Sequence, residues 1–359
     1  PQTGYSVFIR TLDAAGNYAD SETHSFKTLA QSGGERPTMP IIVEGLTEGG
    51  GGAAANTAAI QAAIDRMAAG GGGEVIIPGG VYDHNGLVMK TGVKLRGQWT
   101  TGTILRNVHG SNVSVSARGQ DSTFINNWAL EDLTLTASNV NAGGQHGLDL
   151  FLCHTFAVRD VTIENHYYGV RESISWYGYY ENMKCTGNVT GWYVPTWEMA
   201  STPNTKVNCN LLYNKQYGLL IENAVTQLTI VGGGIEWNGA GGIKITGDAS
   251  RAILFDGVNI EGNAGYAVEI GDAGSGPNGI SFRNCTIRRE GQAAGSVAIQ
   301  LNRGVCIELM NCKFFFYDTA VRTTSSVSFI ITFASFDSIG TAYNFDGTLI
   351  PVSEAAGAY

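Results

Sequence analysis

Short apolar runs recur along this chain, separated by a nearly constant interval of about 25 residues. The position that aligns the runs holds, in order, Leu135, Ile163, Cys185, Leu211, Ile235, Ile260, Ile287, Phe314 and Ser338. Three residues before it stands a small residue that favours a turn, and five residues before it an apolar residue, with Lys206 as the exception. This pattern predicts one strand-turn-strand unit repeated about nine times.

A column of asparagines supports the same repeat, because Asn188, Asn214, Asn238 and Asn263 fall at one position in four successive units. A coil with about 25 residues per turn and about 4.8 Å between turns stacks such like residues into ladders. A propeller blade needs roughly 40–45 residues and antiparallel hairpins, which this spacing does not supply. The sequence therefore predicts an all-β fold, a right-handed parallel β-helix of about nine or more rungs.

One segment has a helical pattern instead. Residues 56–69 start at Asn56, a residue type that caps helices, and place Ile60, Ile64 and Met67 on one face. We expect this helix to cap the β-helix, which would span 56–345. Residues 1–28 contain two alternating strands that resemble the last hairpin of a fibronectin type III module, residues 29–55 are interpreted as a linker, and residues 346–359 as a C-terminal tail.

Composition narrows the function classes. The 359 residues carry a formal net charge of −9, which argues against a nucleic-acid partner. No apolar run approaches the roughly 18 residues of a membrane span, so membrane insertion is not expected. The chain begins at Pro1 without a basic-then-apolar leader, so we expect a piece of a longer protein from which no targeting signal can be read.

The start of the predicted β-helix resembles a known group. The segments 56–61, 75–82 (Val-Ile-Ile-Pro-Gly-Gly-Val-Tyr), 92–97 and 103–105 are similar to the opening of pectate-lyase-like β-helix proteins, which include bacteriophage tailspike depolymerases and secreted bacterial polysaccharide-degrading enzymes. Asn56 stands where that group usually has Asp, and no Asp-Asp pair of the polygalacturonase type occurs. The resemblance implies a bacterial surface polysaccharide (capsule or O-antigen) as partner, a homotrimer, and an extracellular or virion location.

In such folds the glycan lies along the outer face of one sheet. Alternation along the matching strands predicts an outward column of Asp149, Arg171, Val194, Leu220, Lys244, Glu269, Gln300 and Arg322. Asp149 beside Arg171, and Lys244 beside Glu269, are interpreted either as ion pairs on a solvated face or as parts of a site.

Hydrolysis of a glycosidic bond is the slightly favoured chemistry. It needs a protonated acid and a second carboxylate separated by roughly 5–9.5 Å. Glu172 falls on an inward position, where an ionised carboxylate is costly, so it either swings into the groove or is a partly buried acid. We expect Glu172 to pair with Asp149, with Glu222 in reserve.

Two alternatives remain open. The first is β-elimination on a uronic-acid polymer by a lyase or epimerase, for which His146, Tyr168, Arg171 and Lys244 supply a base and cations. The second is a β-helix that only binds glycan. Aromatic rings stack on pyranose rings, and the candidates for sugar contact, together with Lys244, are Tyr168, Trp176, Tyr177, Trp192, Trp197 and Trp237. No cofactor or metal is expected, because the His residues lack ligand spacing.

Overall fold

The computed structural model describes residues 39–139, 143–196, 200–223, 225–272, 274–324, 327–332 and 334–345, together with four short strands before them. Of these four, β1 (Gly4–Val7) pairs with β4 (His24–Lys27) and β2 (Arg10–Leu12) with β3 (Tyr18–Asp20), both antiparallel. The first part of the expected linker, 29–38, and the expected tail 346–359 lie outside the described residues.

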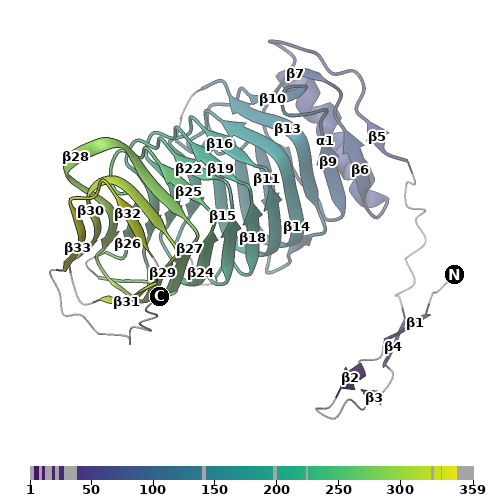
Figure 1. Ribbon diagram of the computed structural model, residues 1–359. Helices are drawn as coiled ribbons and strands as arrows, with labels where there is room; N and C mark the ends of the chain where they lie inside the picture. Colours follow the sequence, from purple (N-terminus) through teal and green to yellow (C-terminus); the bar gives the residue numbers. More distant parts are fainter. Residues whose placement is uncertain are drawn as a thin grey trace.

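The described strands from β5 onward coil into a parallel β-solenoid of about ten turns (Figure 1). Each strand pairs in parallel with its equivalent one turn before and one turn after, as the sequence predicted. Each turn contributes a segment to each of three sheets, numbered 1 to 3 here, and five long strands pass round a corner and so belong to more than one sheet.

Sheet 1 contains β8 (Leu87–Val88), β11 (Val115–Arg118), the start of β14 (Leu148–Glu164) and of β15 (Tyr168–Glu181), β17 (Thr190–Val194), β20 (Tyr217–Ile221), β23 (Gly241–Ile245), β26 (Val268–Ile270), the ends of β28 (Thr286–Leu301) and β30 (Lys313–Thr323), and β33 (Thr341–Phe345).

Sheet 2 contains β5 (Ile41–Ile42), β6 (Gly73–Ile76), β9 (Val93–Arg96), β12 (Ile125–Asn126), the start of β13 (Ala129–Ala137), further parts of β14 and β15, β18 (Asn204–Val207), β21 (Leu228–Val231), β24 (Arg251–Asp256), β27 (Asn278–Arg283), β29 (Gly304–Met310) and β31 (Val327–Thr332).

Sheet 3 contains β7 (Gly80–His84), β10 (Thr103–Asn107), the ends of β13 and β14, β16 (Lys184–Thr186), β19 (Asn210–Leu212), β22 (Gly234–Glu236), β25 (Asn259–Glu261), the starts of β28 and β30, and β32 (Ser335–Asp337).

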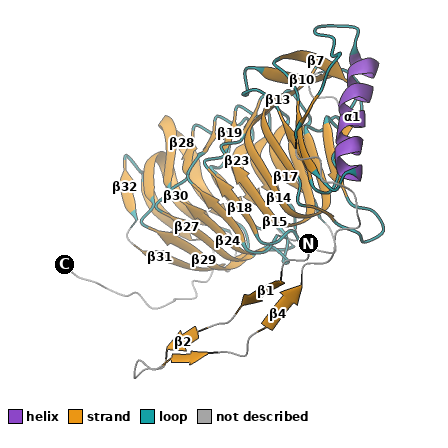
Figure 2. Cartoon of the chain, turned by 90° about the vertical axis from the view of Figure 1, so that its right-hand side faces the viewer, coloured by secondary structure: helices purple, strands orange, loops and turns teal. Residues whose placement is uncertain are grey.

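A single helix in the described residues, α1 (Ala53–Ala69), lies across the N-terminal end of the solenoid (Figure 2). Its predicted apolar face is confirmed, since Ile60, Ile64 and Met67 are fully buried. The helix begins earlier than residue 56, inside the expected linker, and Gly52 stands at its N-cap. Asn56 is not the cap: it is buried, and its side chain bonds the backbone of Thr47 and Asp83. Among the described residues, no helix has the length and apolar character needed to cross a membrane.

The predicted columns match the strand register through eight of their nine rows. Leu135, Ile163 and Cys185 are paired in register, and the column continues through Phe314. The ninth row is wrong by two residues, because Phe314 pairs with Phe336 rather than with Ser338. The exceptional Lys206 does lie in the apolar column, between Tyr180 and Ile230.

The asparagine column forms a buried ladder at the corner between sheets 3 and 1. Each side-chain amide of Asn188, Asn214 and Asn238 donates to the Oδ1 atom of the next asparagine, at 2.9–3.2 Å. The ladder starts one rung earlier at His166, whose backbone N–H donates to Asn188 Oδ1. Satisfied polar side chains inside the solenoid therefore fix how each rung sits on the next.

Candidate functional site

Glycines set the register of sheet 1. Gly147, Gly169, Gly191, Gly218 and Gly242 occupy one position in successive rungs, and a Cβ atom added at Gly169 would stand 2.5 Å from the Gly191 carbonyl oxygen. Only glycine fits so close to the next backbone. The register then aligns Tyr193, not Val194, with Arg171 in the outward row, while Val194 is buried in the interior.

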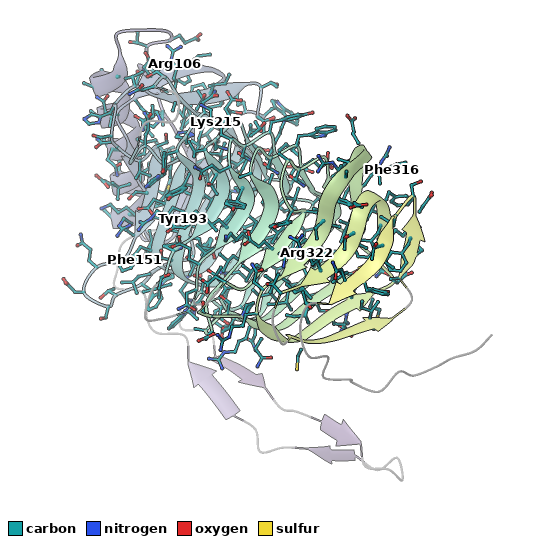
Figure 3. All side chains as sticks on the ribbon, turned by 90° about the vertical axis from the view of Figure 1, so that its left-hand side faces the viewer. Arg106, Phe151, Tyr193, Lys215, Phe316 and Arg322 are labelled. Atoms are coloured by element: carbon teal, nitrogen blue, oxygen red, sulfur yellow. The ribbon has the colours of Figure 1, made fainter. Side chains whose placement is uncertain are left out.

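Three aromatic rings from successive rungs lie together on this outer face. His146 stacks on Tyr168 with 4.9 Å between ring centroids, and Tyr168 stacks on Tyr193 at 4.2 Å. Figure 3 shows Tyr193 and Arg322 on the same face of the solenoid, toward opposite ends. We call His146, Tyr168, Tyr193 and Arg171 the sheet 1 cluster.

The protonation states within this cluster differ from those in water. Burial lowers the pKa of His146 to about 4; the charge of Asp149 opposes this shift, and the cations Arg171 and Arg118 add to it. The Nδ1 atom of His146 is buried without a hydrogen-bond partner among the described residues. Burial raises the pKa of Tyr168. At neutral pH the site therefore presents an uncharged imidazole beside a protonated phenol.

Asp149 lies on the outer face but is occupied by two cations. Its carboxylate accepts from Arg118 at 2.5 Å and from Arg171 at 3.1 Å, and the residue is almost fully buried. Lys244 and Glu269 form a similar pair at 3.1 Å, and hydrogen bonding to Glu269 raises the pKa of Lys244 although burial alone would lower it. Both pairs thus bridge neighbouring rungs, as the predicted outward column places them.

Glu172 lies inside the solenoid, so of its two expected placements the swing into the groove does not occur, and the carboxyl is almost fully buried. Strand β15 continues through it, and its carboxylate binds Lys206 Nζ at 3.2 Å. Trp192 Nε1 and Asn204 Nδ2 also donate to it. Trp192 is fully buried here, with its ring 3.9 Å from Lys206 Nζ, so the expectation that it binds sugar at the surface is wrong. Asp149 stands beside Arg171, the residue directly before Glu172. Because consecutive residues of a strand point to opposite sides, Glu172 and Asp149 lie on opposite faces of the sheet.

Glu222 joins the sheet 1 cluster to a pocket. Its carboxylate accepts from the Tyr193 hydroxyl at 2.6 Å. The pocket, of about 640 Å³, opens where the strands of sheet 1 end, and its lining includes Glu222, Asp248 and Asp272. Backbone N–H groups of Gly274 and Ser275 lower the pKa of Asp272. Within the described part of the chain, no three His, Cys, Asp or Glu side chains are grouped so as to hold a metal ion.

The other expected sugar-contacting aromatics are dispersed. Trp176 and Tyr177 stand at the corner between sheets 1 and 2, where Trp176 donates to the Ala200 carbonyl and packs on Phe124 at 4.5 Å. Trp237 stands at the corner between sheets 3 and 1. Trp197 lies outside the described residues.

Sequence reasoning missed Tyr193 and Arg118. A signal for Tyr193 was present: starting the repeat at Gly191 rather than at Trp192 places it outward. No comparable signal existed for Arg118, because its strand precedes the first row that the sequence aligned.

Similar solved structures share the fold across very different roles. The A-module of mannuronan C-5 epimerase AlgE4 from Azotobacter vinelandii matches with a TM-score of 0.60 at 16% identity, over 87% of this chain and all of that one. The Dettilon tailspike protein matches at 0.60 and 12%, over 85% of this chain and 68% of that one. PfbA, a surface adhesin of Streptococcus pneumoniae, matches at 0.61 and 12%, over 86% and 91%. At such identities the likeness shows the fold alone.

The sequence itself matches one family model. No curated protein is similar enough in sequence to count as a relative. The model described as a right-handed beta helix region matches residues 91–287, which is more than half of the chain and includes the sheet 1 cluster. This chain belongs to the right-handed β-helix family.

Proposed function

We propose that this protein depolymerises a uronate-containing polysaccharide of the bacterial surface by β-elimination on the outer face of sheet 1. The observation that carries this proposal is the neutral His146 stacked on the protonated Tyr168, with Arg171 beside both. Elimination needs these three functions: a base for the proton at sugar C5, an acid for the leaving oxygen and a cation for the uronate carboxylate.

Each step has a residue in place. Arg171 and Arg118 neutralise the sugar carboxylate, which makes the C5 proton more acidic; Asp149 holds both cations in position. The His146 imidazole takes the C5 proton. The C4–O bond then breaks, a double bond forms between C4 and C5, and Tyr168 gives its phenolic proton to the departing oxygen. No water is added to the products.

Hydrolysis remains a second candidate because of the pocket beside Glu222. Asp248 follows the strand of the next rung, and Asp272 follows the strand after that. Neighbouring rungs are about 4.8 Å apart, so carboxyl groups one or two rungs apart fall within the roughly 5–9.5 Å that glycoside hydrolases use. Glu222 and Asp248 would then replace the expected pair of Asp149 and Glu172, whose side chains lie on opposite faces of the sheet.

Mass spectrometry of products from a panel of capsular, O-antigen and uronate polysaccharides tests both candidates. Elimination yields unsaturated oligosaccharides without added water, whereas products that carry an added water would overturn it in favour of Glu222 and Asp248. Under elimination, Tyr168→Phe lowers turnover by about 10²-fold or more with the fold intact. Tyr179→Phe is the matched control: it lies on the same strand, but on sheet 2 beside Arg159, and should keep full activity.

Assembly and location belong to the same proposal. We infer a tailspike-like homotrimer that acts outside the bacterial cell or on a virion, supported by the fold shared with the Dettilon tailspike. Light scattering of the purified chain tests the trimer. Binding of polysaccharide without any product across the whole panel would instead favour a non-catalytic glycan-binding role, as the shared fold with an adhesin also permits.

A further inference from the structure

One corner of the solenoid repeats a left-handed backbone conformation on five successive rungs. The residues directly before the asparagine ladder, at the corner between sheets 3 and 1, have φ values between 53° and 66°: Asn165, Gly187, Tyr213, Trp237 and Gly262. Asparagine and glycine adopt this conformation at the lowest cost, and a bulky side chain costs roughly 1–2 kcal/mol more. Tyr213 and Trp237 are therefore anomalous at these two consecutive rungs.

The Tyr213 ring is not part of the core. Tyr213 is 61% exposed, and Trp237 on the next rung is half-buried. Their rings are nearly parallel, with an angle of 13° and 6.4 Å between centroids. A strained backbone that displays aromatic rings at the surface indicates a role in binding rather than in packing.

The neighbouring rungs leave room around the rings. A Cβ atom at Gly262 would stand 2.7 Å from the Trp237 ring, so that ring lies against the Gly262 backbone. Gly187, at the equivalent position one rung before Tyr213, carries no side chain, and a Cβ atom there would meet only Asn165 Oδ1 within 4 Å. Trp237 thus lies parallel to Tyr213 one rung after it, whereas the equivalent residue one rung before has no ring.

The polar surroundings favour an uncharged ligand. Glu236 comes directly before Trp237, and its carboxylate accepts from Asn259 Nδ2 at 2.9 Å. Asn259 also donates to Glu261, which pairs with Arg288 at 3.7 Å. The carboxylate of Glu236 repels an anionic sugar, while its free lone pairs accept hydrogen bonds from hydroxyl groups.

We propose that Tyr213, supported by Trp237, binds an uncharged pyranose ring of a glycan at the corner between sheets 3 and 1. The corner extends past Lys215, which Figure 3 labels. Tyr213 leads into β20, two rungs beyond the strand of Tyr168, which corresponds to about 10 Å along the axis. The site therefore stands on its own observations and does not depend on the chemistry of the sheet 1 cluster.

Affinity electrophoresis of the full chain in gels that contain a neutral β-glucan, mannan, galactan or dextran tests this site. At least one of these glycans should retard the wild type. Tyr213→Asn should weaken that binding about tenfold or more, since it removes the stacking ring, whereas Tyr213→Phe should keep it. The proposal is overturned if none of these neutral glycans retards the wild type, or if Tyr213→Asn binds like the wild type.

A matched control separates binding from folding. Trp99 is, like Tyr213, an exposed aromatic residue with a positive φ, of 71°, but it lies in the loop between β9 and β10. Trp99→Asn should leave the retardation unchanged, and a comparable loss there would overturn the proposal. Tyr213→Asn puts at this corner the residue type that Asn165 already supplies, so its midpoint of thermal unfolding should be no lower than that of the wild type.

Discussion

Arg171 and Glu172 are neighbours in the sequence, yet they belong to two different environments. Arg171 points outward, where it shares the Asp149 carboxylate with Arg118 and remains partly exposed to solvent. Glu172 points inward, where Lys206, Trp192 and Asn204 enclose its carboxylate and both charged groups are almost fully buried. These two successive residues thus each belong to an ion pair, one on the outer face of the sheet and one in the interior of the solenoid.

The difference shows which pair the fold depends on. The outer pair is open to water on its arginine side, although Asp149 itself is almost fully buried. Solvent therefore screens Arg171, and its charge remains available to a ligand. A buried pair has lost its hydration, and removing one partner leaves an uncompensated charge in the interior. We therefore expect the inner pair to govern stability and the outer pair to govern chemistry.

The largest effect is expected from breaking the inner pair. Glu172→Gln leaves the Lys206 ammonium without its counter-charge, although the amide can still accept from Trp192. The free energy of unfolding should fall by about 3–5 kcal/mol, measured by urea denaturation.

The double variant Glu172→Leu with Lys206→Met is its control. Both side chains then match apolar columns, beside Leu150 in one and Ile230 in the other. Most of the lost stability should return. If the double variant unfolded as easily as Glu172→Gln, the charge would not be the cause.

A smaller effect, visible only in acid, is expected from the buried histidines. Burial lowers the pKa of His166 to about 3, and the nearby His84 and His146 lower it further. Burial also lowers the pKa of His84 to about 4, although the charge of Asp83 opposes this shift. The unfolded chain binds these protons near pH 6.5, so the stability they confer is complete above that pH and is lost as the pH falls toward about 4.

His166→Asn extends the asparagine ladder by one rung and removes one of these groups. The variant should lose stability less steeply than the wild type between about pH 6.5 and about 4, by a few kcal/mol at the acid end. Thermal unfolding across this range measures it. Parallel pH profiles for the two proteins would contradict the assignment to His166.

The smallest change in stability is expected on the outer face. Arg171→Gln leaves Asp149 paired with Arg118, so the free energy of unfolding should change by about 0–1 kcal/mol. The chemistry should respond more strongly: Arg171 helps to hold the pKa of His146 down, so its loss raises that pKa. The acid limb of the activity profile should move to higher pH, and an unmoved limb would separate Arg171 from His146.

The fold was predictable because a solenoid repeats its evidence on every rung. Leu135 and its equivalents stack on one another, so a misaligned residue in one rung is corrected by the positions in the other rungs. The start of α1 was not predictable, because Asn56 is a residue type that caps helices but here forms hydrogen bonds with the backbone of Thr47 and Asp83. The last row failed where no further rung followed to correct the count.

The site was less predictable for a geometric reason. Columns in the sequence describe neighbours along one sheet, but they carry no information about which sheets face each other across the interior. Glu172 on sheet 1 and Lys206 on sheet 2 were each anomalous in their own columns, and nothing in the sequence joined them. The prediction for the rung of Tyr193 was wrong for a simpler reason: the strand was aligned one residue too late, and aligning Gly191 with the other glycines places Tyr193 outward.

The left-handed corner has a consequence for how this molecule can change. It offers one position per rung at a fixed pitch, directly before the asparagine ladder. The five positions differ in the space they leave: Gly187 is nearly open, Gly262 lies against the Trp237 ring, and the Asn165 amide bonds Thr136. A substitution at one of these positions therefore acts on a single rung, about 4.8 Å from the next, and the left-handed φ makes asparagine and glycine the least costly residues there.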